Sequence, residues 1–144
     1  MDRIIRELRL NDLPELIDIE RRAFTHPWPP EAFDENLLPN SWVILVEDKL
    51  VGYVLYHVFE DEAVILNIAI DPDYQGLSHG SHLLQQTLDM LESEGKRRIF
   101  LDVRETNLTA LNVYKKLGFT EIGIRKDYYN NPIENAIMMG RFHT

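Results

Sequence analysis

A strand that runs directly into a glycine-bearing loop and then a helix is the feature that most constrains this fold. The apolar run over residues 65–70 stops at Asp71-Pro72, and a helix begins near Gly80. A loop at a helix N-terminus directs several backbone N–H groups, and the positive end of the helix dipole, to one place. The segment therefore suits a phosphate, although many connections of this kind bind nothing.

Apolar spacing and the positions of glycine, proline and capping residues predict the other elements. The acidic segment 47–49 predicts a hairpin between two β-rich runs. Strands are expected over residues 3–10, 42–46, 51–59, 62–70, 98–104, 119–124 and 134–142. Helices are expected from Asn11 or Asp12 to Phe24, from Pro30 to Leu37, from Gly80 to Gly95, and over residues 108–117.

These elements follow the order strand, two helices, three strands, helix, strand, helix and two strands. Strands and helices do not alternate regularly, which argues against a doubly wound fold. A chain of 144 residues most simply forms one domain, here residues 1–144. The sequence therefore predicts a single α+β domain, with a mixed, mostly antiparallel central sheet of about seven strands flanked by about four helices.

Charge and composition exclude several classes of function. Fifteen basic residues against 24 acidic ones leave a net charge of −9, which repels nucleic-acid phosphates. The same charge favours a cationic partner, such as a basic peptide or an amine, but it also serves solubility alone. There is no cysteine, so disulfides, thiolate nucleophiles and cysteine zinc sites are excluded. With no apolar signal core and no run long enough to span a bilayer, we expect a cytoplasmic protein.

Three polar residues in the second half of the chain are candidates for chemistry. Asp102 lies inside an apolar strand, where a lone acid is costly unless it is hydrogen-bonded or faces solvent. Tyr114 shares a helix face with Leu111, and such a tyrosine is commonly half-buried with its hydroxyl in water. Asn107 precedes the same helix and suits an N-cap. From the residues alone, a structural role remains open for each of the three.

At this point several motifs resemble one family. The loop after residue 70, Asn107 and the block 114–119 resemble the GNAT superfamily of acetyl-CoA-dependent N-acetyltransferases. The closer similarity is to its RimI type, the ribosomal-protein-alanine N-acetyltransferases, and it extends over nearly the whole chain. The segments that carry it are 22–28 with Phe33, 67–75, 101–104 and 124–129.

The resemblance implies acetyl-CoA as co-substrate and no metal. The family's pyrophosphate loop, Gln/Arg-x-x-Gly-x-Gly/Ala, falls on Gln75, Ser78 and Gly80, so a serine replaces one glycine. Arginines common in this loop are absent, and His79 and His82 are expected to supply partial positive charge instead. The residues that the resemblance places on the cofactor are Ile68, Ala69, Ile70, Gln75, Gly76, Leu77, Ser78, His79, Gly80, Ser81 and Asn107.

The resemblance also implies the catalytic pair, with Asp102 as the base and Tyr114 as the acid. Asp102 is one methylene shorter than the family's glutamate, which leaves a gap to the amine that a bridging water could fill. An α-amine is roughly 14% neutral at pH 7 and a lysine amine only about 0.04%, so the α-amine demands less of the base. The peptide is expected to contact Trp28, Tyr128 and Tyr129, for which surface packing is an equal alternative.

The sequence therefore predicts an N-α-acetyltransferase. It would move acetyl from acetyl-CoA to the N-terminal alanine of a ribosomal protein, by direct attack in a ternary complex. The expected partner is the N-terminus of a basic protein, with no direct contact to nucleic acid or membrane. One alternative is a GNAT enzyme acting on a small-molecule amine or a lysine side chain. Another is a CoA-binding module without catalysis.

Overall fold

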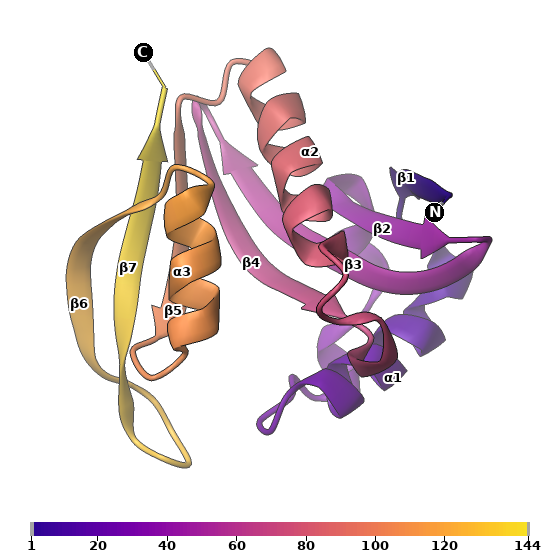
Figure 1. The fold of residues 1–144 in the computed structure, drawn as a ribbon, viewed down its shortest axis with the longest axis horizontal. Helices are drawn as coiled ribbons and strands as arrows, with labels where there is room; N and C mark the ends of the chain where they lie inside the picture. The colour runs from indigo at the N-terminus through magenta and orange to yellow at the C-terminus, as the bar shows by residue number, and fades with distance from the viewer. Residues whose placement is uncertain (1, 144) are drawn as a thin grey trace. The chain divides into compact units, whose positions relative to one another are not determined.

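The computed structural model describes residues 2–143, and over this range the chain forms seven strands in one sheet (Figure 1). Their order is β1-β2-β3-β4-β5-β7-β6. Antiparallel pairs join β1 to β2, β2 to β3, β5 to β7 and β6 to β7, whereas β4 pairs with β5 in parallel. This arrangement confirms the predicted mixed, mostly antiparallel sheet of an α+β fold. The strands are β1 (Arg3–Glu7), β2 (Ser41–Val46), β3 (Lys49–Phe59), β4 (Glu62–Ile70), β5 (Arg98–Arg104), β6 (Thr120–Tyr129) and β7 (Glu134–Phe142).

Three of the four expected helices are α-helical in the described part of the chain: α1 (Leu13–Ala23), α2 (His79–Ser93) and α3 (Leu108–Lys116). The second expected helix is present as two short 3-10 turns, η2 (Pro30–Ala32) and η3 (Glu35–Asn40). Asp34 interrupts it, because its carboxylate accepts a hydrogen bond from the N–H of Asn36 at 2.9 Å and begins a new turn. Two further 3-10 turns are η1 (Leu10–Asp12) and η4 (Pro72–Tyr74). Among residues 2–143, no helix has the length and apolarity needed to cross a bilayer.

The chain divides into two compact units. The first holds the residues up to 56 together with 67–87, and the second holds 57–66 together with the residues from 88 onward. Strand β4 and helix α2 therefore each contribute residues to both units.

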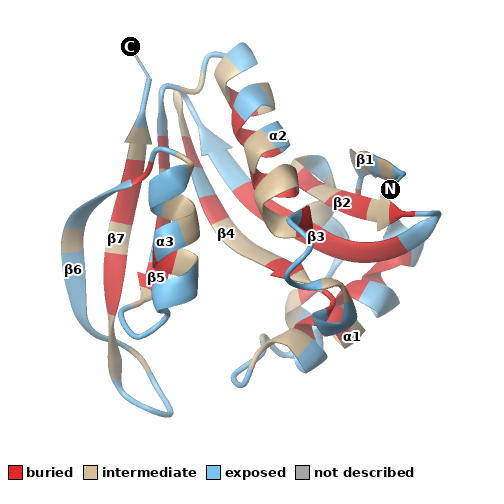
Figure 2. Ribbon diagram, viewed as in Figure 1, coloured by how far each residue is buried: buried red, intermediate tan, exposed pale blue. Residues whose placement is uncertain are grey.

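In the first unit, the core is built around β2 and β3. Strand β3 is buried over seven consecutive residues after Lys49, as the red segment in Figure 2 shows. Leu16 and Ile19 form the buried face of α1. The hairpin predicted at residues 47–49 is confirmed, with Val46 opposite Lys49. Glu47 and Asp48 both have positive φ, 50° and 69°, as a two-residue type I′ turn requires.

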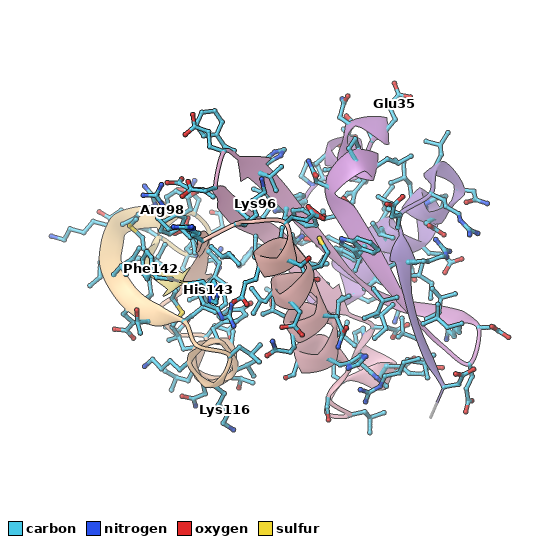
Figure 3. All side chains as sticks on the ribbon, turned by 90° about the horizontal axis from the view of Figure 1, so that it is seen from above. Glu35, Lys96, Arg98, Lys116, Phe142 and His143 are labelled. Atoms are coloured by element: carbon cyan, nitrogen blue, oxygen red, sulfur yellow. The ribbon has the colours of Figure 1, made fainter. Side chains whose placement is uncertain are left out.

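In the second unit, β7 lies between β5 and β6, so the C-terminal strand is paired within the chain on both sides. Figure 3 shows Arg98 and Phe142, which are opposite one another in the register, beside His143. Strand β5 alternates as predicted, with Ile99, Leu101 and Val103 buried. The parallel pairing of β5 with β4 covers only Arg98–Phe100 and Glu62–Val64, so Ile65 and Leu66 do not continue it.

Gly52 allows the end of β4 to approach β3 closely. A Cβ at this position would lie 2.8 Å from the carbonyl oxygen of Ala69 and 2.5 Å from Cδ1 of Ile70. The first of these is a backbone atom, so the strand itself would have to move. We expect Gly52→Ala to lower the free energy of unfolding by about 1–3 kcal/mol, measured by urea denaturation.

Gly80→Ala is the matched control in the same unit. Its Cβ would meet only Cγ1 of Ile70, at 3.4 Å, and alanine suits a helix better than glycine. We expect no loss of stability in this variant. Equal destabilisation of both variants would contradict the close-approach explanation for Gly52.

Candidate active site

The end of β4 is held by an ion pair in which the carboxylate is buried and the arginine reaches the surface. Asp71, 2% exposed, receives two hydrogen bonds of 2.9 Å from the guanidinium of Arg22. Its carboxylate also accepts from the N–H of Asp73 at 2.9 Å, and its own N–H donates to Val51 O at 2.7 Å. The Arg22 hydrogen bonds hold the pKa of Asp71 below its usual range, so the carboxylate stays charged. These contacts fix the point at which the strand becomes the loop.

The loop itself has the geometry of an anion site. Gly76 and Ser78 both take left-handed conformations, with φ of 78° and 68°. Gln75 donates from Nε2 to Ile70 O at 3.0 Å, which ties the loop back to the strand. Ser78 O accepts the first helical hydrogen bond, from His82 N at 3.0 Å, so residues 79–81 supply free N–H groups at the start of α2. These N–H groups and the helix dipole fit a pyrophosphate.

The predicted positive charge on His79 is wrong. The side chain is 1% exposed, and neither ring nitrogen has a hydrogen-bond partner. Burial lowers the pKa of His79, and the nearby charges of Arg3 and His82 act in the same direction. The ring is therefore neutral and packs near Tyr74, with 6.4 Å between ring centroids. Within residues 2–143, no group of three or more His, Asp or Glu side chains is placed to hold a metal ion.

Trp28 belongs to the first unit and lies in the segment between α1 and η2. Its half-buried ring is 5.7 Å from the ring of Phe33. Its backbone N–H donates to the carboxylate of Glu20 at 2.9 Å. Glu20 also accepts from Asn67, the residue before Ile68–Ile70 of β4, at 2.6 Å. Sequence reasoning did not single out Glu20, because an acid on an amphipathic helix is normally solvated.

Asp102 faces away from the buried side of β5, in the second unit. Its carboxylate lies 3.5 Å from Nε of Arg125 on β6, and its side chain is 29% exposed. The two residues border a groove whose walls are otherwise apolar. Arg125 was not predicted as a partner, although it lies in the motif block 124–129. The apolar lining comprises Val64, Phe100, Leu101, Ile122, Met138 and Met139.

Two of the candidate tyrosines of the second unit, Tyr114 and Tyr129, keep their hydroxyl protons to high pH. Burial raises the pKa of Tyr114 to about 12, and its ring meets Phe119 edge-on, 6.0 Å away. The pKa of Tyr129 is also raised to about 12, first by burial and then by the negative charge of Asp102. Tyr114 has a smaller effect on Tyr129 in the same direction. Tyr129 therefore lies within electrostatic range of both predicted catalytic residues.

Glu134 organises the loop before α3. It accepts hydrogen bonds from the N–H of Thr106, at 2.9 Å, and from its hydroxyl, and it pairs with Arg104 at 3.1 Å. Arg104 in turn lies over the ring of Tyr129, 4.2 Å from its centroid. Tyr128 packs edge-on against Tyr129, with 5.1 Å between centroids. Sequence reasoning missed Glu134, since its partners are about 30 residues away along the chain.

Asn107 caps α3, as its position suggested. Its side-chain oxygen accepts a hydrogen bond from the N–H of Ala110 at 3.1 Å. The capping bond uses only the carbonyl end of the amide, so the NH₂ end can still donate to a ligand. The structural role is therefore established, and the predicted cofactor contact remains a prediction.

The predicted site residues are thus distributed over both units. Residues 68–70, the loop 75–81 and Trp28 belong to the first unit. Asp102, Asn107, Tyr114, Tyr128 and Tyr129 belong to the second. Within the second unit, Tyr129 is the residue that interacts with Asp102, Tyr114 and Tyr128.

The acetyltransferase (GNAT) family model matches residues 13–119, and the chain belongs to this family. The resemblance drawn from its motifs is confirmed. A [ribosomal protein bS18]-alanine N-acetyltransferase of Escherichia coli (strain K12) is 37% identical over 139 residues, which cover 94% of this chain and 94% of that protein.

Two solved structures share the fold over nearly their whole length. The crystal structure of the ribosomal-protein-S18-alanine N-acetyltransferase from Escherichia coli has a TM-score of 0.90 at 35% identity, covering 98% of this chain and 94% of that chain. The structure of Ard1 from Thermoplasma volcanium has a TM-score of 0.91 at 26% identity, covering 100% of this chain and 99% of that chain.

Ser78 bears a conformational cost that glycine would not. A non-glycine residue in the left-handed region costs roughly 1–2 kcal/mol, and a glycine returns about 0.5–1 kcal/mol of this as chain entropy. We therefore expect Ser78→Gly to raise the free energy of unfolding slightly. Ser78→Val should lower it by about 1 kcal/mol or more. Urea denaturation of the three proteins tests the order Gly, Ser, Val, and any other order would contradict it.

His79 makes the stability depend on pH. Because its pKa is lowered in the folded state, the unfolded chain binds a proton at a higher pH than the folded chain does. The contribution of His79 is complete above its ordinary pKa of about 6.5 and is lost as the pH falls below that value. We expect His79→Leu to flatten the loss of stability between pH 7 and pH 5, in urea titrations at several pH values.

His57→Gln, which changes an exposed histidine, is the control for this experiment. It should leave the pH dependence as in the unchanged protein. If His79→Leu shows the same pH dependence as the control, the buried neutral ring does not explain it.

Proposed function

We propose that this chain transfers the acetyl group of acetyl-CoA to the N-terminal α-amine of a protein, an alanine on a ribosomal protein. The observation that carries the proposal is the loop 75–81, whose left-handed residues and free N–H groups at the start of α2 suit a pyrophosphate. The Escherichia coli relative, 37% identical over 94% of this chain, is named for this acceptor.

In this proposal the cofactor is bound mainly by backbone groups. The N–H groups at the start of α2 receive the pyrophosphate, and the NH₂ of Asn107 donates a further hydrogen bond. The backbone N–H groups of residues 68–70 polarise the acetyl carbonyl and stabilise the oxyanion that forms on it. With His79 neutral, the attraction for phosphate rests mainly on backbone dipoles, and the Arg3 guanidinium, which donates to Leu77 O at 3.1 Å, adds positive charge beside the loop.

The acceptor amine must be neutral when it attacks the thioester carbon. As the new C–N bond forms, the amine loses a proton to Asp102, directly or through one water, and the C–S bond then breaks. Arg125 lies 3.5 Å from the Asp102 carboxylate and holds it in place beside the acceptor. The chain has no cysteine, which excludes a thiol-linked acetyl-enzyme, and in this proposal the acetyl group passes directly between the two substrates in a ternary complex.

Tyr114 acts on the leaving sulfur as a hydrogen-bond donor. Its pKa of about 12 exceeds an ordinary thiol pKa of about 8.5. Complete proton transfer from Tyr114 to the thiolate is therefore uphill by roughly 5 kcal/mol. The buried hydroxyl nevertheless remains protonated at every working pH, so it stabilises the charge that develops on sulfur as the C–S bond breaks.

The acceptor peptide contacts Trp28, Tyr128 and Tyr129 in this proposal. Exposed Tyr128 and half-buried Tyr129 offer an aromatic surface beside Asp102. The net charge of −9 favours the basic N-terminus of a ribosomal protein through long-range attraction. Residues 1–144 act as one catalytic domain, and the protein works in the cytoplasm, where its acceptor is made.

Acetyl transfer to two synthetic peptides tests the function. One peptide has a free N-terminal alanine followed by basic residues, and the other has a blocked N-terminus and an internal lysine. We expect transfer to the α-amine only, detected as a mass gain of one acetyl group. Transfer to the lysine peptide alone, or to neither peptide while acetyl-CoA still binds, would reject the proposal.

Replacing the two catalytic residues separates their roles. We expect Tyr114→Phe to lower kcat by about 10²–10⁴-fold, with acetyl-CoA binding retained in calorimetry. Asp102→Asn should lower the rate by a similar factor, and Asp102→Glu should restore most of it because the carboxylate is retained. Activity in Tyr114→Phe equal to that of the unchanged protein would exclude Tyr114 as the donor.

A further inference from the structure

Glu20 of α1 is a buried acid that receives hydrogen bonds from three separate elements. It is 2% exposed. One oxygen accepts from the backbone N–H of Trp28 at 2.9 Å. The other accepts from the Tyr53 hydroxyl on β3 and from Nδ2 of Asn67 on β4, the latter at 2.6 Å. A surface acid would not be placed in this way.

All three partners are donors, which fits an ionised carboxylate that can only accept. Burial and the charge of Glu20 raise the pKa of Tyr53, so this hydroxyl keeps its proton and continues to donate. Such charge-assisted hydrogen bonds are stronger than neutral ones. Losing any one of the three donors would leave part of the buried charge uncompensated.

The bond to Trp28 matters most, because the segment around it is rich in proline and has few backbone N–H groups. Pro27 and Pro29 flank Trp28 and have no N–H, so Trp28 N–H is the only backbone donor across this tripeptide. The Trp28 ring then rests on Phe33, which meets Tyr53 edge-on with 6.2 Å between centroids. The backbone of Trp28 is therefore bonded to Glu20 directly, and its ring is linked to Glu20 through Phe33 and Tyr53.

We propose that Glu20 is a positioning residue for the acceptor peptide, holding the Trp28 segment in a fixed place relative to the end of β4. Asn67, its second anchor, directly precedes residues 68–70, whose N–H groups are assigned to the acetyl carbonyl. One carboxylate thus joins the segment assigned to the acceptor to the strand assigned to the acetyl group. The inference rests on the proposed function and adds a residue that neither substrate touches.

Glu20→Gln tests the proposal by steady-state kinetics with the free-alanine peptide. The carboxamide places an NH₂ group against at least one of the three donors while keeping nearly the same shape. We expect the peptide KM to rise about tenfold or more, with the dissociation constant of acetyl-CoA changed less than about twofold. Glu15→Gln makes the same charge change on the exposed side of α1 and should change neither value.

Tyr53→Phe is the second variant, and it separates positioning from general packing. It removes one donor to Glu20 but leaves the bonds to Trp28 and Asn67. We expect reduced stability with a peptide KM close to that of the unchanged protein. A KM that rises as much as in Glu20→Gln, or no rise in a folded Glu20→Gln, would overturn the proposal.

Hydrogen exchange of the Trp28 amide tests the anchor without any acetyl transfer. In the unchanged protein this amide should be protected, despite its place in a proline-rich segment. In Glu20→Gln it should exchange about tenfold faster or more, whereas in Glu15→Gln it should not change. An unprotected amide in the unchanged protein would overturn the proposal, whereas failure of peptide acetylation alone would reject only the proposed function.

Discussion

The ion pair between buried Asp71 and the more exposed Arg22 is the interaction on which the rest of the first unit depends. It joins α1 to the residue at which β4 ends, while the N–H of Asp71 bonds to Val51 on β3. Loss of Arg22 would leave the buried Asp71 carboxylate without its partner, which is strongly destabilising. Because the strand must end at Asp71, the loop begins at a defined place and α2 presents its free N–H groups there.

Burial keeps two side chains of the candidate site neutral. Burial removes charge from His79, so this side chain adds no positive charge to the loop, and the backbone N–H groups at the start of α2 are its main anion donors. Burial also keeps Tyr114 protonated, which suits a hydrogen-bond donor better than a proton source. Asp102, by contrast, is partly exposed and keeps an arginine partner. Tyr114 and Asp102 therefore differ in burial and in their neighbours, as a hydrogen-bond donor and a base require.

Much of the fold followed from local pattern. The strand bounds 62–70, 98–104 and 134–142 were predicted as observed, because alternating apolar residues and turn residues mark them. The second helix was wrong in type, since Asp34 begins a new turn that apolar spacing does not reveal. Strand β6 extends five residues beyond its predicted end at Ile124, because pairing with β7 outweighs its polar composition.

By itself, the sequence determined the family, the order of elements and the identity of the candidate residues, because these depend on neighbours along the chain. The tertiary structure decided which polar groups are buried and what each one bonds to. Glu20, His79 and Glu134 look like ordinary polar residues in the sequence. Their roles depend on partners or burial contributed by distant segments, and the cost of burying a polar group depends on those surroundings rather than on residue type.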